Sequence, residues 1–306
     1  MAIDADIVRV FPLHNGERVP VVDRKKELLL QKVRDKLVLV DVDMQNVEKK
    51  IKFLERFNKS VLDAFVFLLD FDKKLDRETG EYVQNTRRSG EIYAYHALEV
   101  LRIIVDEFGF DCKNEKFTDL FVATILHDTY EDELEGKGRY FWKKEDMKLL
   151  HMIKSKFKSD GLLLRLDGVS KHKEHGTVND QETYNSVMRA ALVYPDVLKL
   201  KLADRLHNWR TIDSMPLTKK LESVRETREF FLPVAEHLGM SKVVDDFNSY
   251  IDIVLEELVT YNSQHDNKLV ADFENMYDIS PWWPRMTEAN DSYPAKVNIN
   301  DLYAIK

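Results

Sequence analysis

The sequence contains few cysteines, glycines and prolines. Only one of the 306 residues is a cysteine, Cys112, so no intramolecular disulfide can form, and the composition fits a reducing compartment. Glycine and proline number only 10 and 8, which leaves few turns and favours long helices. We therefore expect a cytoplasmic protein with a mostly helical fold.

Long apolar runs are missing as well. The longest, VLDAFVFLL, is about half as long as the roughly 20 residues that a membrane span needs, and it contains Asp63. The N-terminal stretch MAIDADIVRVFPLHNGERVP mixes charges and prolines with short apolar runs, so it lacks the apolar core of a signal peptide. The sequence therefore predicts no membrane segment and no membrane partner.

An excess of positive charge is the third absence. Lysine and arginine total 46 against 54 aspartates and glutamates, which gives a net charge of -8. Such a surface repels the phosphates of nucleic acids, so a nucleic-acid partner is not expected. A ligand that carries phosphate would have to be held by a local basic pocket or by a metal ion.

Helical periodicity runs through most of the chain. Apolar residues three and four apart recur in HALEVLRIIVDEFG, FTDLFVATILHDTYED and PDVLKLKLADRLHNWRTI, which predicts an all-α helical bundle. We interpret residues 1–57 as an N-terminal helical extension, 58–245 as the main domain, and 246–306 as a C-terminal helix with a tail. Turn formers between Asp72 and Arg87 allow a small hairpin there. The tail, ISPWWPRMTEANDSYP, is expected to dock its indoles on the protein or on a second subunit, which leaves a homo-oligomer open.

Four side chains that bind metals or protons end the segment FTDLFVATILHDTYED. His127 and Glu131 are four residues apart, as are Asp128 and Asp132, so all four lie along one flank of a helix. Three carboxylates this close repel one another, and a bound cation would relieve that repulsion. Taken alone, the segment could equally be a solvated acidic helix end.

A second segment, PDVLKLKLADRLHNWRT, places polar groups on an apolar helical face. Asp204, Asn208 and Thr211 fall on one stripe, and aspartate is seldom buried unless it is paired or binds a metal. The alternative is an ion pair of Asp204 with Arg205 or Lys201. We do not expect it, because neither basic residue points along this stripe.

A third segment, RRSGEIYAYHALEVLRIIV, places His96 at the start of an amphipathic helix. A single histidine there would usually be structural. Together with His127, Asp128 and Asp204, however, it completes a set of two imidazoles and two carboxylates. That set suits a six-coordinate cation such as Mn²⁺ or Mg²⁺ better than a thiolate-bound zinc.

The order and spacing of these segments resemble a known family. RRSGE, YAYHALEVL, HDTYED, DGVSKHK and LKLADRLHNWRT, followed by FLPVAEHLGM, are similar to the hydrolase domain of the RelA/SpoT family, a branch of the HD superfamily. The resemblance covers roughly residues 58 to 245. It implies an HD-domain helical bundle that hydrolyses the 3′-pyrophosphate of (p)ppGpp, the alarmone of the stringent response, to GDP or GTP and pyrophosphate. Nothing that follows resembles the family's synthetase, so the chain looks like a stand-alone small alarmone hydrolase.

The resemblance also implies roles for individual residues. The metal ion, usually Mn²⁺, would be held by four ligands: His96, His127, Asp128 and Asp204. Glu131 and Asp132 would orient and activate the attacking water. The residues implied to contact the guanine nucleotide are Arg87, which stacks on the base, Arg88, Ser89, Asn208, Thr211 and, near the phosphates, Lys171.

Departures from the family pattern concern the pocket more than the metal ligands. Arg88 stands where lysine is common, Ser170 where threonine is common, and Trp209 where methionine is usual. Two alternatives therefore stay open: an HD phosphohydrolase acting on another nucleotide such as NADPH or a dNTP, and a regulator that binds the alarmone without turnover. A functional pairing with an alarmone synthetase, as an antidote, is a further expectation from the family.

Overall fold

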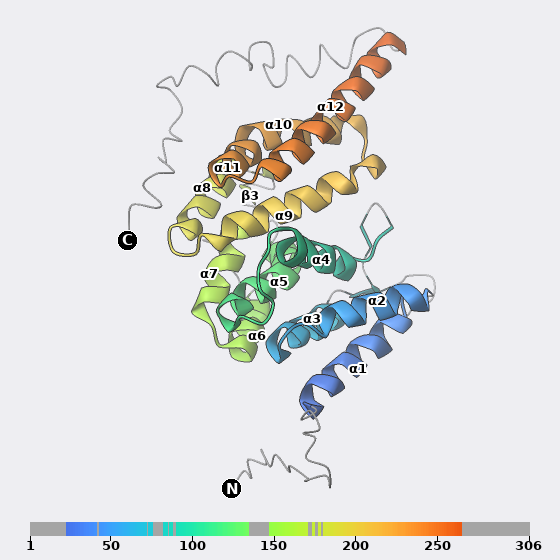
Figure 1. Cartoon of the computed structure of the whole chain (residues 1–306), viewed down its shortest axis with the longest axis vertical. Coiled ribbons are helices and arrows are strands. Elements are labelled where there is room, and N and C mark those ends of the chain that lie inside the picture. The colour runs from blue at the N-terminus through green and yellow to red at the C-terminus, as the bar shows by residue number, and fades with distance from the viewer. Residues whose placement is uncertain are drawn as a thin grey trace, which may run out of the picture.

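The described part of this computed structural model is helical apart from two small hairpins (Figure 1), which confirms the predicted all-α class. The structure describes residues 23–41, 43–71, 73–75, 82–84, 86–87, 90–134, 147–170, 173–174, 177–178 and 180–264. No helix within these ranges is long and apolar enough to cross a membrane. The predicted roles of the tail and the boundaries of the three segments remain predictions.

The N-terminal helices expected from the sequence are present. α1 spans Arg24–Val38, α2 spans Met44–Leu54, and α3 spans Lys59–Phe71. Aspartates begin the first two: Asp23 accepts a hydrogen bond from the backbone N–H of Lys26, and Asp43 accepts from those of Gln45 and Asn46. These caps satisfy N–H groups that have no partner inside the helix. α1 packs on both α2 and α3 and buries Val33 and Leu37.

Two hairpins interrupt the helices. β1 (Lys73–Leu75) pairs antiparallel with β2 (Tyr82–Gln84), where the turn formers allowed a small hairpin. β3 (Lys173–Glu174) pairs antiparallel with β4 (Thr177–Val178). Between them lie α4 (Tyr93–Arg102), the π-helical turn Ile103–Glu107, the 3₁₀ turn Glu115–Phe117 and the helices α5 (Thr118–Leu134), α6 (Met147–Phe157) and α7 (Asp160–Val169).

α5 is the central helix of the core. It contacts α3, α4, α7 and α9, and every residue from Leu120 to His127 is buried. A helix that is covered on several sides is apolar all round rather than amphipathic, which explains the run LFVATIL. His127 and Asp128, which follow this run, are therefore held at the interior rather than on a solvated surface.

α9 (Asp196–Arg210) crosses the middle of the molecule, with α4 and α5 on one side and α10–α12 on the other (Figure 1). The remaining elements are α8 (Asp180–Ala191), the 3₁₀ turn Ile212–Ser214, α10 (Leu217–Glu226), the π-helical turn Thr227–Phe231, α11 (Leu232–His237) and α12 (Ser241–Gln264).

Trp209 anchors α9 to the C-terminal helices. Its side chain is buried, its Nε1–H donates to Thr227 Oγ1 at 2.9 Å, and its ring stacks on Tyr250 of α12 with centroids 5.9 Å apart. A methionine at this position could neither donate that hydrogen bond nor stack. Contacts with Thr227 and Tyr250 therefore accommodate a tryptophan at position 209, where methionine is usual in the family that the sequence resembles.

Candidate metal centre

The predicted ligand side chains come together from three helices. His96 lies on α4, His127 and Asp128 on α5, and Asp204 on α9. His96 Nε2 is 3.4 Å from Asp128 Oδ2 and 3.3 Å from Asp204 Oδ1. His127 Nε2 is 3.1 Å from Asp128 Oδ1 and 3.6 Å from Asp204 Oδ1. Both imidazoles are buried, and the two carboxylates are mostly so.

These separations suit the coordination shell of a cation. Two ligands about 2.1 Å from one ion lie about 3.0 Å apart at a right angle and about 3.4 Å apart at a tetrahedral angle. Neither His96 Nε2 nor His127 Nε2 makes a hydrogen bond in the described structure, although both atoms are buried. A buried nitrogen without a partner is costly, and a metal ion would remove that cost. The cluster could therefore hold a divalent metal ion, and ligand atoms of His96, His127 and Asp204 all lie within 4.8 Å of one another.

The backbone of α5 fixes the orientation of His127. Its Nδ1 lies 2.8 Å from the carbonyl oxygen of Thr124. A carbonyl can only accept, so Nδ1 donates to it, and Nε2 is the nitrogen that faces the carboxylates and would bind an ion. This is the usual way in which a protein prepares a histidine as a metal ligand.

The electrostatics of the cluster favour a positive charge at its centre. Burial would lower the pKa of His127, but the carboxylates of Asp128 and Asp204 outweigh it and raise that pKa to about 10. For His96 burial prevails, so its pKa is lowered despite the same carboxylates. Burial would raise the pKa of Asp128 and of Asp204, yet the neighbouring histidines hold both well below the usual range. Both carboxylates are therefore ionised at neutral pH.

Two residues that the sequence analysis did not single out belong to the cluster. His207 Nδ1 lies 2.7 Å from His96 Nδ1, and His207 Nε2 lies 4.0 Å from Glu91 Oε2. Burial lowers the pKa of His207 to about 3, with a further contribution from His96 and Arg87. A usable signal existed, because His207 stands three residues after Asp204 on the same helix.

The expectation that neither Lys201 nor Arg205 reaches Asp204 is wrong for Lys201. Its Nζ lies 3.6 Å from Asp204 Oδ2, one turn along α9. The four-carbon stem lets the ammonium group reach a carboxylate off its own stripe while the stem stays buried. Arg205 instead pairs with Glu226. Asp204 therefore faces a lysine with one oxygen and the histidines with the other.

Arg87 and Asn208 adjoin the cluster. Arg87 Nη2 donates to Asn208 Oδ1 at 2.6 Å, and Asn208 Nδ2 donates to Asp204 Oδ1 at 3.0 Å. Arg87 Nη1 is buried and makes no hydrogen bond in the described structure. A tight turn holds Arg87 in place, because its N–H donates to the carbonyl of Glu91 at 2.7 Å and Gly90 adopts a φ of 85°.

The other predicted site residues are placed only in part. Glu131 is half-buried one turn beyond His127 on α5. Thr211 caps the end of α9, and its hydroxyl donates to the carbonyls of His207 and Asn208 in its own helix. Four predicted residues lie outside the side chains that the structure describes: Arg88, Ser89, Asp132 and Lys171.

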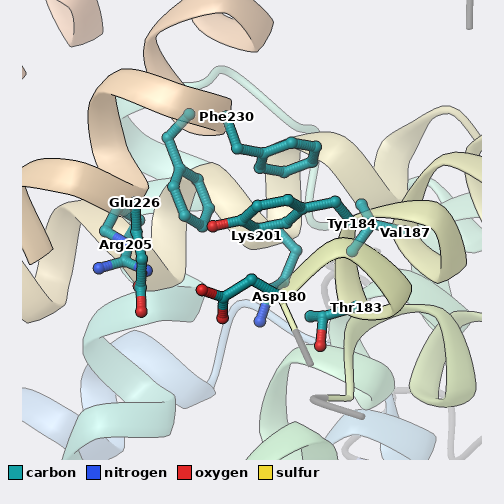
Figure 2. A pocket seen from close by; sticks show the side chains of 9 residues that line it. Asp180, Thr183, Tyr184, Val187, Lys201, Arg205, Glu226 and Phe230 are labelled. Atoms are coloured by element: carbon teal, nitrogen blue, oxygen red, sulfur yellow. The ribbon is translucent and has the colours of Figure 1, made fainter. Parts of the chain in front are cut away.

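A small cavity between α8, α9 and α10 is separate from this arrangement of ligands (Figure 2). Its lining is Asp180, Thr183, Tyr184, Val187, Lys201, Arg205, Glu226, Phe230 and Phe231. The enclosed space is about 20 Å³, enough for one water molecule and far too little for a nucleotide. Its cations are already paired, Arg205 with Glu226 and Lys201 with Asp204. The cavity is therefore no substrate pocket.

Comparison with known proteins defines the class of this domain. Residues 75–241 match the family model of the HD domain, which is more than half of the chain, so the chain belongs to the HD-domain family. One similar protein is the probable GTP pyrophosphokinase of Mycobacterium leprae (strain TN), 33% identical over 165 residues, which cover 53% of this chain and 18% of that protein.

Two further relatives have names that refer to guanine-nucleotide enzymes. The bifunctional (p)ppGpp synthase/hydrolase RelA of Mycobacterium tuberculosis is 33% identical over 162 residues, 53% of this chain and 19% of that protein. A putative chloroplastic GTP diphosphokinase of Oryza sativa subsp. japonica is 31% identical over 170 residues, 51% of this chain and 17% of that protein. The matched part of this chain thus spans less than a fifth of each of these relatives. The HD-domain match and these RelA/SpoT-type relatives agree with the family that the motifs resemble.

Proposed function

We propose that this protein hydrolyses the 3′-pyrophosphate of (p)ppGpp to GDP or GTP and pyrophosphate in a reaction that depends on a divalent metal, with Mn²⁺ as the first candidate. One observation carries the proposal: two buried imidazole nitrogens without hydrogen bonds face two ionised carboxylates, beside an arginine with an unused donor. An HD domain with RelA/SpoT relatives supports an enzyme of the phosphohydrolase type. The name of one relative includes (p)ppGpp hydrolysis.

His96, His127, Asp128 and Asp204 are the residues that would hold the ion. A divalent cation in such a site would lower the pKa of a water molecule bound to it and would neutralise negative charge on the phosphate oxygens. The donor set of imidazoles and carboxylates, with no thiolate, is typical of Mn²⁺ or Mg²⁺ more than of structural zinc.

Glu131 is proposed as the residue that takes the proton from the attacking water, either alone or with Asp132. It lies four residues after His127, so α5 presents both side chains on one flank, and the residue is half-buried. A carboxylate close to the reacting water needs only to accept one proton and pass it to solvent.

Arg87 and Asn208 are proposed to bind the nucleotide. The planar guanidinium of Arg87 suits stacking on guanine, and Nη1 still has hydrogens to donate to a phosphate oxygen. Asn208 connects this arginine to Asp204, so a nucleotide that engages Arg87 is held against the metal ligands. In this proposal Thr211, Arg88, Ser89 and Lys171 complete the contacts.

The test is to incubate the full chain with ppGpp and Mn²⁺, to repeat the reaction with chelator, and to separate the products by anion exchange. We expect GDP and pyrophosphate, and no product after chelation. Asp204→Asn should abolish turnover, whereas Asp213→Asn, the same change at an exposed residue three positions beyond α9, should not. Binding of ppGpp without any Mn²⁺-dependent release of pyrophosphate would refute the proposal and favour a regulator, and turnover of NADPH or a dNTP in its place would favour another phosphohydrolase.

A further inference from the structure

The contact between His96 and His207 links a predicted metal ligand to a residue with no assigned role. The two Nδ1 atoms are 2.7 Å apart, and the rings meet edge to face with centroids 4.7 Å apart. Both side chains are buried, His96 at 0% exposure and His207 at 5%. Burial favours neutral rings, and two neutral imidazoles can share one hydrogen bond only if one nitrogen carries a hydrogen and the other a lone pair.

This contact allows two arrangements with opposite consequences. If His96 Nδ1–H donates, His96 Nε2 has a lone pair for the ion, and His207 must carry its hydrogen on Nε2. If His207 Nδ1–H donates, His96 carries its hydrogen on Nε2, which points at Asp128 and Asp204 and cannot bind a metal. The tautomer of His207 therefore decides whether His96 is a ligand.

Glu91 lies where it can select between them. Its Oε2 is 4.0 Å from His207 Nε2, and its backbone carbonyl is fixed by the N–H of Arg87. A carboxylate at this distance favours a hydrogen on His207 Nε2 over a lone pair, because the N–H dipole then points at the negative charge. Without an ion, the carboxylates 3.3 and 3.4 Å from His96 Nε2 favour a hydrogen on that nitrogen. Once a cation is bound at His96 Nε2, the hydrogen of His96 must be on Nδ1, and the preference set by Glu91 leaves His207 Nδ1 ready to accept it.

We propose that Glu91 and His207 are positioning residues that hold His96 in the tautomer a metal ion requires, through the chain Glu91–His207–His96. This inference rests on the metal-binding part of the proposed function. A metal-binding histidine commonly donates its other N–H to a fixed acceptor, and here that acceptor would be a second imidazole, His207. Loss of such an acceptor typically weakens metal binding about 10- to 100-fold.

A second metal site at Glu91, His96 and His207 is the competing interpretation, since their ligand atoms all lie within 4.8 Å of one another. The separation of 2.7 Å between the two Nδ1 atoms argues against it. Two nitrogens that bind one ion at about 2.1 Å are at least about 3.0 Å apart in octahedral or tetrahedral geometry. The observed distance is that of a direct hydrogen bond.

The tautomers can be read in the protein saturated with Mg²⁺, which is diamagnetic. Two-bond ¹H–¹⁵N correlation spectra of the full chain labelled at histidine distinguish the two nitrogens of each ring. With the ion bound, we expect His127 and His96 to carry hydrogen on Nδ1 and His207 to carry it on Nε2. A hydrogen on Nδ1 of His207 would overturn the inference. Glu91→Met should weaken the binding of Mn²⁺ about 10- to 100-fold in calorimetric titration, and an unchanged affinity would overturn the role of Glu91.

A matched pair of variants separates hydrogen bonding from packing. Asn and Leu have nearly the same shape, and the Oδ1 of His207→Asn replaces Nδ1 as an acceptor, whereas His207→Leu cannot accept. Calorimetric titration with MnCl₂ should show affinity within a few-fold of wild type for His207→Asn and about 10- to 100-fold weaker for His207→Leu. Equal affinities would overturn the inference, because the loss of ring packing is common to both variants.

These measurements use no nucleotide, which separates the two proposals. A protein that binds Mn²⁺ and shows the expected tautomers but does not cleave ppGpp would contradict the proposed function and support the positioning chain. A wild-type protein that binds no Mn²⁺ would overturn both.

Discussion

Gly168 of α7 lies directly against Ala190 of α8. A Cβ placed on Gly168 of α7 would lie 2.3 Å from the Cβ of Ala190 on α8, against at least 3.4 Å in an ordinary contact. Gly168→Ala must therefore push these helices apart by about 1 Å or distort them. Overpacking of this kind costs about 1–3 kcal/mol, and the higher helix propensity of alanine offsets at most about 1 kcal/mol. We expect the free energy of unfolding to fall by about 1–2 kcal/mol.

The reciprocal change provides the control. Ala190→Gly alone loses a methyl group, about 0.8 kcal/mol, and about 1 kcal/mol of helix propensity. The double variant Gly168→Ala with Ala190→Gly moves the methyl group from one helix to the other and removes the overlap. Its stability should return to within about 1 kcal/mol of wild type, a coupling of about 2–3 kcal/mol between the two positions.

Urea unfolding of all four proteins, followed both by circular dichroism and by tryptophan fluorescence, measures this cycle. Coincident transitions from the two probes would justify a single free energy for each protein. If the losses of the two single variants simply added in the double variant, the close contact between Gly168 and Ala190 would be refuted.

Two further predictions concern α9. Arg210 donates two hydrogen bonds of 2.7 Å to Glu107 and thereby holds the pKa of that carboxyl below its usual 4.5. Glu107→Gln should lower the free energy of unfolding by about 1–3 kcal/mol near neutral pH, a deficit that disappears as the pH falls from 4.5 through the lowered pKa; a deficit that urea titrations find unchanged at acid pH would contradict this assignment. Asn208→Leu conserves shape but loses the bonds to Arg87 and Asp204, so steady-state kinetics should show a KM for ppGpp raised about 10- to 100-fold, and an unaltered KM would exclude Asn208 from nucleotide binding.

The parts of the site that sequence reasoning could predict are those that depend on spacing within one helix. His127 and Asp128 end an apolar run, and that run identified a helix that is buried from Leu120 to His127. Asp204 and Asn208 are four apart, and the structure joins them by a hydrogen bond of 3.0 Å. Such contacts follow from helical geometry, because residues one turn apart are neighbours whatever the tertiary fold.

The contacts that could not be predicted depend on where the helices cross. His96 and His207 are 111 positions apart, and nothing in either segment alone indicates that their rings meet. His207 stands three residues after Asp204, so the helical period could have placed it near that residue but could not have identified the ring it meets. The ring reaches His96 because α4 crosses α9 beside that residue. Lys201 was misjudged for a related reason, since stripes describe Cβ directions and not the reach of a long side chain.

Asp204 contacts the ligand histidines, Asn208 and Lys201 at once, so a variant of Asp204 changes several interactions together. One of its oxygens faces both ligand histidines and accepts from Asn208, while the other faces Lys201. Loss of activity in Asp204→Asn could therefore reflect metal binding, nucleotide binding or an unpaired buried lysine. The ion pairs that the structure describes for Asp128 involve only His96 and His127. Asp128→Asn is consequently the cleaner probe of the metal, and only the excess effect of Asp204→Asn over it can be ascribed to the connection with the nucleotide.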